Sequence, residues 1–199
     1  MEKTSDRFEI RLAGFGGQGM ILAGLILAEA AAIYDGKNAI QTQSYGPEAR
    51  GGASGSEVVI SDGPIHYPKV MSADVLLALS QEACDKYFYS LKSDGLLIVD
   101  SESVERVPSS RAVVLPITDL AEEATGRAIT ANILALGLIG GLTGVVSREA
   151  LEKAVSAHVP KGMVDLNLQA VAAGWEKAEE LRRRAEEPAH TRSWSGAAG

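Results

Sequence analysis

The feature that most constrains the fold of this chain is the segment Gly14-Phe15-Gly16-Gly17-Gln18-Gly19, which separates two different apolar patterns. Before it, residues 8–13 alternate apolar and charged side chains, which predicts a strand. After it, residues 20–34 are almost continuously apolar and only Glu29 is charged, which predicts a helix largely covered by other elements. A strand, a glycine-rich turn and a helix in this order predict the first unit of an α/β domain.

Strand and helix patterns keep alternating along the rest of the chain. Short apolar runs predict further strands at residues 39–42, 56–61, 74–79, 96–99 and 111–115. Helices are predicted at residues 81–91, 120–125, 128–139, 148–157 and 164–187. This order predicts a three-layer, Rossmann-like α/β domain with a mostly parallel sheet and a helical C-terminal part. We expect one domain over residues 1–185 and a flexible tail over residues 186–199.

Charge and cysteine content narrow the classes of function. The chain carries 19 Lys and Arg against 26 Asp and Glu, so its net charge of −7 disfavours binding to nucleic acid or to an anionic membrane. The single cysteine, Cys84, excludes an internal disulfide and cannot ligate an iron–sulfur cluster, which is typical of a reducing compartment. We therefore expect a cytoplasmic protein that contacts neither nucleic acid nor membrane.

One uncharged stretch, Ala128–Val146, is long enough to span a bilayer. Glycine, threonine and asparagine interrupt it, and the pair Gly140-Gly141 predicts the end of a helix. We interpret the stretch as a buried helix followed by a turn. The helix predicted next, at residues 148–157, has Ser147 as its expected N-cap.

The segment Gly14–Gly19, called the glycine loop below, suits the binding of an anion. Glycines permit a tight turn, and the free amides and positive end of the following helix attract a phosphate. A dinucleotide site also expects an acidic residue at the end of the second strand, but that strand ends in Gln41-Thr42-Gln43-Ser44. Asp35 precedes the strand, where we expect it to shape the Asp35-Gly36 turn. A nicotinamide or flavin cofactor is therefore disfavoured, and a purely structural role for the glycines stays open.

A second irregular segment, residues 43–52, follows the second predicted strand. Loops that combine hydroxyl, aromatic, acidic and guanidinium groups commonly bind ligands. In a doubly wound sheet both loops leave the same edge, so Arg50 can clamp a phosphate or carboxylate there, or else form a structural salt bridge with Glu48. The candidate ligand-binding residues are Gly14, Gly16, Gly17, Gln18, Gly19, Ser44, Tyr45, Glu48, Arg50, Gly51 and Gly52.

Familiar catalytic sets are absent from the sequence. His66, His158 and His190 lie far apart without the spacing of metal ligands. Cys84 has no adjacent base and Ser44 has no nucleophile elbow. We therefore expect no metal site and no complete catalytic apparatus in this chain alone.

Several motifs carry a resemblance to a known family. They are the glycine loop with Ala23-Gly24, the run Gln43-Ser44-Tyr45-Gly46-Pro47-Glu48-Ala49-Arg50-Gly51-Gly52-Ala53-Ser54, and the segments 56–61, 64–65 and 73–83. Together they closely resemble the gamma subunit of 2-oxoacid:ferredoxin oxidoreductases, and the second motif looks most like the 2-oxoglutarate type. The resemblance covers roughly residues 8–180.

The resemblance implies a subsidiary place in a multi-subunit enzyme. Such an enzyme decarboxylates a 2-oxoacid on thiamine diphosphate, sends electrons through iron–sulfur clusters to ferredoxin and transfers the acyl group to coenzyme A. Alpha and beta subunits are expected to bind thiamine diphosphate and magnesium, and a ferredoxin-like delta subunit to hold clusters. This chain is expected to complete the active-site wall, with the Gly16–Gly19 amides and Arg50 meeting coenzyme A or another anion and Tyr45 lining the crevice.

Two other interpretations stay open. One is a free-standing nucleotide-binding or regulatory module without redox chemistry. The other is the beta subunit of an indolepyruvate oxidoreductase, which shares the first glycine motif but typically lacks the Tyr-Gly-Pro-Glu run of residues 45–48.

Overall fold

The computed structural model describes residues 7–44 and 54–186. Five expected ligand-binding residues lie outside this part of the chain, namely Tyr45, Glu48, Arg50, Gly51 and Gly52. The expected flexible tail also lies outside it, except for Glu186.

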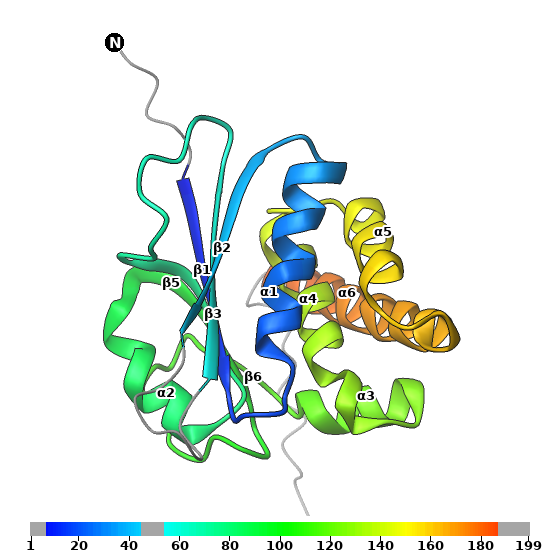
Figure 1. Cartoon of the computed structure of the whole chain (residues 1–199). Coiled ribbons are helices and arrows are strands. Elements are labelled where there is room, and N and C mark those ends of the chain that lie inside the picture. The colour runs from blue at the N-terminus through cyan, green and yellow to red at the C-terminus, as the bar shows by residue number, and fades with distance from the viewer. Residues whose placement is uncertain (1–6, 45–53, 187–199) are drawn as a thin grey trace, which may run out of the picture.

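The described strands form one mixed sheet (Figure 1). They are β1 Arg7–Gly14, β2 Asn38–Ser44, β3 Ser54–Ser61, β4 Ala73–Ala78, β5 Leu91–Asp100 and β6 Val113–Leu115, in the order β2-β3-β1-β4-β5-β6. Among them, β3 alone runs antiparallel to its neighbours β1 and β2. The short β2–β3 connection explains this, because only antiparallel neighbours can be joined without a long crossover. The expected α/β fold with a mostly parallel sheet is confirmed.

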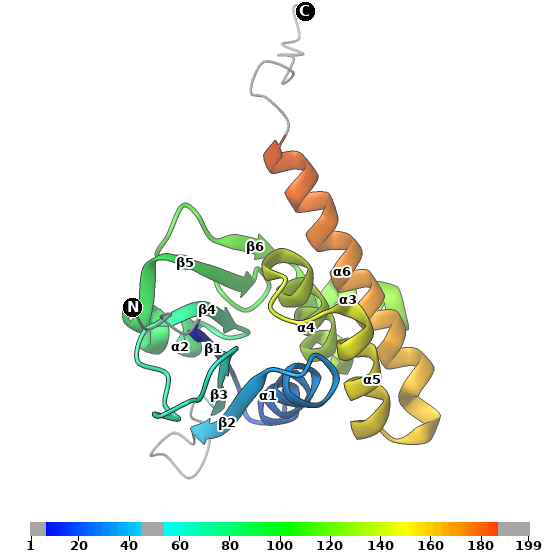
Figure 2. The same ribbon diagram turned by 90° about the horizontal axis from the view of Figure 1, so that it is seen from above.

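The helices cover the two faces of the sheet unequally (Figures 1 and 2). One face carries α1 Met20–Glu29 with its π-helical continuation Ala30–Tyr34, α3 Ile117–Thr125, α4 Ala131–Thr143, α5 Arg148–His158 and α6 Val164–Glu186. The other face carries α2 Gln81–Tyr87. Ser147 caps α5 as expected, because its Oγ accepts a hydrogen bond from the amide of Ala150 at 3.1 Å.

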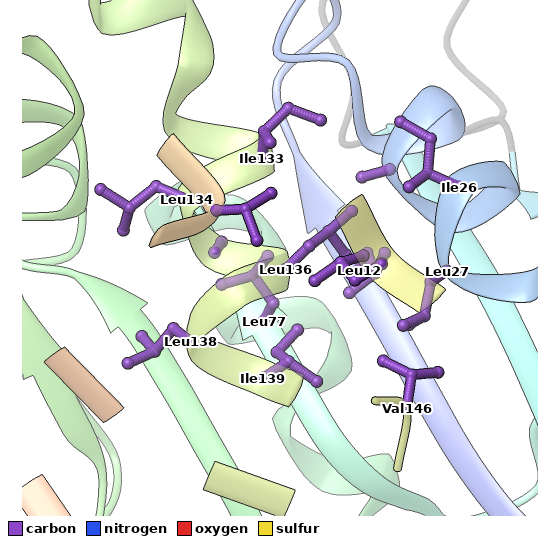
Figure 3. Close-up of a cluster of buried hydrophobic side chains, with 14 of the residues drawn as sticks. Leu12, Ile26, Leu27, Leu77, Ile133, Leu134, Leu136, Leu138, Ile139 and Val146 are labelled. Atoms are coloured by element: carbon purple, nitrogen blue, oxygen red, sulfur yellow. The ribbon is translucent and has the colours of Figure 1, made fainter. Parts of the chain in front are cut away.

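The main core lies between the sheet and the helices α1 and α4. Figure 3 shows Leu12 of β1 and Leu77 of β4 pointing toward Ile26 of α1 and Leu136 of α4, and all four are almost completely buried. Burying aliphatic side chains of this size is the largest favourable contribution to folding. The core therefore fixes α1 and α4 against β1, the strand that leads into the glycine loop.

The Gly140-Gly141 pair does not end the helix, contrary to the sequence-based expectation. α4 continues to Thr143 and ends at Gly144, whose φ of 66° is the left-handed conformation that glycine favours. A Cβ at Gly140 would lie 2.6 Å from the Trp175 ring of α6, so this glycine provides space for a neighbouring helix instead. The interpretation of the segment as a buried helix is otherwise correct, since residues 131–141 are buried.

Several element boundaries differ from the predicted ones, and two of these differences, at α2–β5 and at α3, have a clear structural reason. The helix expected at 81–91 ends at Tyr87 and passes through a 3-10 turn, because Leu91 already pairs with Ala73 and β5 begins there rather than at 96. α3 begins three residues before the predicted position, directly after Pro116, whose carbonyl accepts from the Leu120 amide at 2.9 Å.

Among residues 7–44 and 54–186, none of the helices taken singly has both the length and the apolar character needed to cross a membrane. The pair Ile117–Thr125 and Ala128–Thr143 meets those criteria jointly, by length and composition only, with a bend of 117° between its parts.

Candidate functional site

The two loops singled out in the sequence leave the sheet at one edge. Gly14 at the end of β1 is paired with Ser54 of β3, and Ser44 at the end of β2 is paired with Gly55, the next residue of β3. The hydroxyl of Ser54 donates a hydrogen bond to the carbonyl of Phe15 in the glycine loop at 3.4 Å. The second loop therefore starts and returns beside the first, on the lower edge of the sheet in Figure 1.

The shape of the glycine loop requires glycine at particular positions. Gly17 and Gly19 have φ angles of 94° and 72°, which L side chains rarely adopt. A Cβ at Gly19 would also lie 2.4 Å from Nδ2 of Asn132, and one at Gly14 would lie 2.3 Å from Oε1 of Gln18. Gly16 is different, because none of the described residues would lie within 4 Å of a Cβ there and its φ is not positive. Gly17 and Gly19 are therefore needed for the backbone conformation of the loop, whereas Gly14 leaves room for the Gln18 side chain.

Gln18 holds the glycine loop to the sheet. Its Oε1 accepts a hydrogen bond from the Phe15 amide at 2.7 Å, and its Nε2 donates to the carbonyl of Leu79 at the end of β4 at 3.2 Å. Both ends of the side-chain amide are thus engaged within the protein. Gln18 acts in the structure as a brace of the loop rather than as a free ligand-binding group.

Asn132 of α4 holds the other end of the loop, and sequence reasoning missed it. Its Nδ2 donates to the carbonyl of Gly19 at 3.2 Å, and its Oδ1 accepts from the amide of Ile133 at 2.9 Å. The residue is only 6% exposed. The available signal was a carboxamide inside the uncharged stretch 128–146, because a buried polar group needs hydrogen-bond partners.

Between these two braces, the loop presents free amides. Among the described residues, nothing accepts a hydrogen bond from the amides of Gly16, Gly17 or Gly19. Gly19 precedes α1 without a side-chain cap, and the first turn of α1 carries no acidic residue. The partial positive charge of the helix N-terminus is therefore not neutralised by the described residues, and the loop can accept an anion.

A pocket of about 250 Å³ opens beside the loop. Gly17–Gly19 and Leu22 form one side, Asn132 and Ile133 of α4 form another, and Met163 and Asn167 close the third. This pocket was not predicted, because it requires α1, α4 and α6 to meet.

Other polar residues named in the sequence have structural roles. The Asp35 carboxylate accepts from both the amide and the hydroxyl of Ser147 at 2.7 Å, so it ties the end of the α1 continuation to the start of α5. Gly36, with φ 69°, takes the left-handed position of the Asp35-Gly36 turn, and the expectation that Asp35 shapes this turn stays a prediction. Cys84 is buried, and burial together with the charge of Asp85 raises the pKa of its thiol.

The histidines are not gathered at the loops. His158 Nε2 lies 2.5 Å from Glu29 Oε2, a contact that joins α5 to α1. His66 is exposed on the loop before β4, and His190 lies outside the described residues. In the part of the chain that the structure describes, no three His, Cys, Asp or Glu side chains are grouped to hold a metal ion.

A buried charged cluster on the α2 face of the sheet was also missed. Arg11 of β1 and Glu57 of β3 are at most 9% exposed and form an ion pair at 2.9 Å. Arg11 lies 4.8 Å from the ring centroid of Tyr87, and both charged residues bond to the backbone of Val70. Arg11 and Glu57 therefore fix the segment before β4, away from the glycine loop.

Comparison with known proteins decides the family. The model of the pyruvate ferredoxin/flavodoxin oxidoreductase family matches residues 9–177, most of the chain. The chain belongs to this family. The resemblance to a gamma subunit of a 2-oxoacid:ferredoxin oxidoreductase, drawn from the sequence motifs, is confirmed.

Several separate subunits of this family are similar to the chain over nearly their whole length. The 2-oxoglutarate synthase subunit KorC of Methanocaldococcus jannaschii is 53% identical, over 88% of this chain and 96% of that protein. KorC of Archaeoglobus fulgidus is 38% identical, over 87% and 89%. The pyruvate synthase subunit PorC of Methanothermobacter thermautotrophicus is 32% identical, over 87% and 97%.

Solved structures of the family share the fold. The keto/oxoacid ferredoxin oxidoreductase gamma subunit from Geobacter sulfurreducens has 55% identity and a TM-score of 0.79, covering 87% of this chain and 99% of that one. The 2-oxoglutarate:ferredoxin oxidoreductase from Magnetococcus marinus, solved with 2-oxoglutarate, coenzyme A and succinyl-CoA, has 24% identity and a TM-score of 0.77. The match covers 87% of this chain and 31% of the Magnetococcus chain, so that likeness concerns the fold.

Proposed function

We propose that this chain is the gamma subunit of a multi-subunit 2-oxoglutarate:ferredoxin oxidoreductase. The reaction converts 2-oxoglutarate and coenzyme A into succinyl-CoA and carbon dioxide, and two electrons pass to ferredoxin. The observation that carries the proposal is the 53% identity to a 2-oxoglutarate synthase subunit over 96% of its length, against 32% for a pyruvate synthase subunit. The enzyme's expected partners are alpha and beta subunits with thiamine diphosphate and magnesium, and a delta subunit with iron–sulfur clusters.

The proposed role of this chain is to position substrate rather than to perform the redox step. A single cysteine cannot supply the four thiolates of a cluster, so the clusters belong to partner chains. The single cysteine also favours a reducing, cytoplasmic location. This chain would complete the wall of the active site, which other subunits share.

Coenzyme A, or another anion in the active site, is the proposed ligand at the sheet edge where the glycine loop and the second loop leave the sheet. The start of α1, which has no side-chain cap, and the amides of Gly16, Gly17 and Gly19, which have no acceptor among the described residues, support this because both favour a phosphate. The loop that leaves the same edge would add Arg50 as a bidentate contact. The other candidates in that loop are Ser44, Tyr45, Glu48, Gly51 and Gly52, whereas Gly14 and Gln18 would serve by holding the glycine loop in shape.

Co-expression with the genes beside this one tests the assignment. The expected product is a brown complex that contains iron and this chain and reduces ferredoxin with 2-oxoglutarate and coenzyme A. Pyruvate, branched-chain oxoacids and indolepyruvate should give lower kcat/KM than 2-oxoglutarate. A preference for indolepyruvate would favour the indolepyruvate enzyme, and a stable colourless monomer that binds a nucleotide would favour the regulatory module.

A further inference from the structure

We propose that the pocket beside the glycine loop binds an uncharged part of a ligand that carries N–H donors on an apolar body. The inference rests on the proposed function, because the glycine loop would hold the anionic part of the same ligand. It adds a second binding element, built by α1, α4 and α6, which none of the sequence motifs indicated.

The walls of this pocket carry no charged side chain among the described residues. Leu22, Ile133, Val159 and Met163 provide apolar contacts, and the polar lining comes from the loop backbone and from uncharged side chains. Charged residues make up 23% of the whole chain, so an uncharged lining distinguishes this pocket from the average composition. A phosphate or carboxylate inside it would lose hydration without gaining a cation, so the pocket favours a neutral group.

Two buried carboxamides line the pocket, and they are incompletely paired. Asn167 of α6 is 6% exposed and donates from Nδ2 to the carbonyl of Met163 at 2.7 Å. Among the described residues, nothing donates to Asn167 Oδ1. Asn132 uses one Nδ2 hydrogen on Gly19 and has no described acceptor for the other. Asn167 Oδ1 is not among the described side-chain atoms that are both fully buried and unpaired, so it is accessible, and the pocket offers it as an acceptor for a ligand N–H.

The size and position of the pocket match a portion of a larger ligand. Its 250 Å³ is below the roughly 300–1,000 Å³ of sites that enclose a whole drug-sized molecule. Gly17 and Gly19 belong both to the pocket wall and to the amide-bearing loop, so one molecule can occupy both. Coenzyme A combines such parts, with phosphates, two amides in its pantetheine arm and an amino group on adenine.

A larger side chain at the opening of the pocket tests directly whether a ligand enters it. Leu22 is 36% exposed and lines the pocket, whereas Leu25, 42% exposed on the same helix, does not. In the assembled complex, Leu22→Trp should raise the dissociation constant of coenzyme A at least tenfold, and Leu25→Trp should leave it unchanged. Asn167→Leu, which keeps the volume and removes the acceptor, should weaken binding in the same direction.

Two fragments identify the part of the ligand that enters the pocket. Titration calorimetry with pantetheine and with adenosine 3′,5′-bisphosphate should show Leu22→Trp weakening one of them, which assigns the pocket to the arm or to adenine. Unchanged dissociation constants for coenzyme A and both fragments, in a complex with unaltered melting temperature, would overturn the inference. If Leu22→Trp weakens coenzyme A binding but Arg50→Ala does not, the proposal that Arg50 binds coenzyme A fails and the proposal for the pocket stands. If Arg50→Ala weakens binding but Leu22→Trp does not, only the proposal for the pocket is rejected.

Discussion

At the scale of single residues, the carboxamide side chains near the site stabilise the glycine loop. Gln18 and Asn132 each donate a hydrogen bond to a backbone carbonyl, at Leu79 and Gly19. Gln18 was a candidate from the motif, whereas Asn132 is distant in sequence and was missed. A carboxamide within an apolar helix indicates a buried hydrogen bond, but its partner is known only once α4 packs beside the loop.

Arg50 is the residue whose removal tests the anion-binding proposal. Losing charge-assisted hydrogen bonds to a phosphate costs about 1.5–3 kcal/mol, so Arg50→Ala should raise the KM for coenzyme A by roughly tenfold or more, or lower turnover. Arg106→Ala is the matched control, because Arg106 is an exposed arginine paired with Asp85 at 3.1 Å on the α2 face. Steady-state kinetics of the assembled complex that are unchanged by Arg50→Ala would refute the proposal.

Glu9 of β1 should make stability depend on acid pH. Burial alone would raise the pKa of this carboxyl, but hydrogen bonds from Arg7 and from the Ser72 and Met71 amides outweigh it and hold the pKa below its ordinary value of 4.5. The stabilisation is therefore present above pH 4.5 and is lost as pH falls through the lowered folded-state pKa.

Denaturant unfolding of Glu9→Gln checks this. At neutral pH the variant should lose about 1–3 kcal/mol of unfolding free energy, and the difference from the parent should shrink as the pH drops below 4.5. Glu149→Gln is the control, since Glu149 is an exposed partner of Lys153 and should change stability little. A difference that stays constant with pH would show that ionisation of Glu9 is not the cause.

At the scale of elements, the close packing of α4 on α6 positions Asn132 and Asn167 around one pocket. Glycines on both helices permit it: a Cβ at Gly137 would lie 2.3 Å from the Val171 carbonyl, and one at Gly174 would lie 2.0 Å from the Leu134 carbonyl. Sequence reasoning expected another glycine pair of α4, Gly140-Gly141, to end the helix. A glycine that ends a helix and a glycine that lets a second helix pack closely have the same low helix propensity. Only the position of the neighbouring helix distinguishes these two roles.

Gly137→Ala should therefore destabilise the protein, although alanine is the better helix former by about 0.8–1 kcal/mol. Overpacking against a backbone carbonyl typically costs roughly 1–3 kcal/mol and outweighs that gain. Gly162→Ala provides the comparison, because its Cβ would have no described residue within 4 Å and its φ is not positive. Thermal unfolding should show a lower Tm for Gly137→Ala and no lowering for Gly162→Ala; equal Tm values for the two variants would contradict the packing argument.

At the scale of the whole molecule, the position of β3 brings the two loops to one edge. β3 lies between β1 and β2 and runs against both, so β1 and β2 are parallel and their carboxyl ends coincide. The same fold occurs as a separate subunit in the Geobacter structure and as about a third of the Magnetococcus chain. A unit that occurs in both contexts has its own core, which here lies between α1, α4 and the sheet.

The sequence by itself determined the α/β class, the order of the elements and the glycine loop, because apolar periodicity and the conformational freedom of glycine act locally. Its motifs also determined the family. The tertiary structure decided the partners of Asn132 and Asp35, the role of the α4 glycines, the burial of Arg11 and Glu57, and the pocket at Asn167. These features depend on contacts between residues separated by tens of positions, and local patterns carry no information about which distant surfaces will meet.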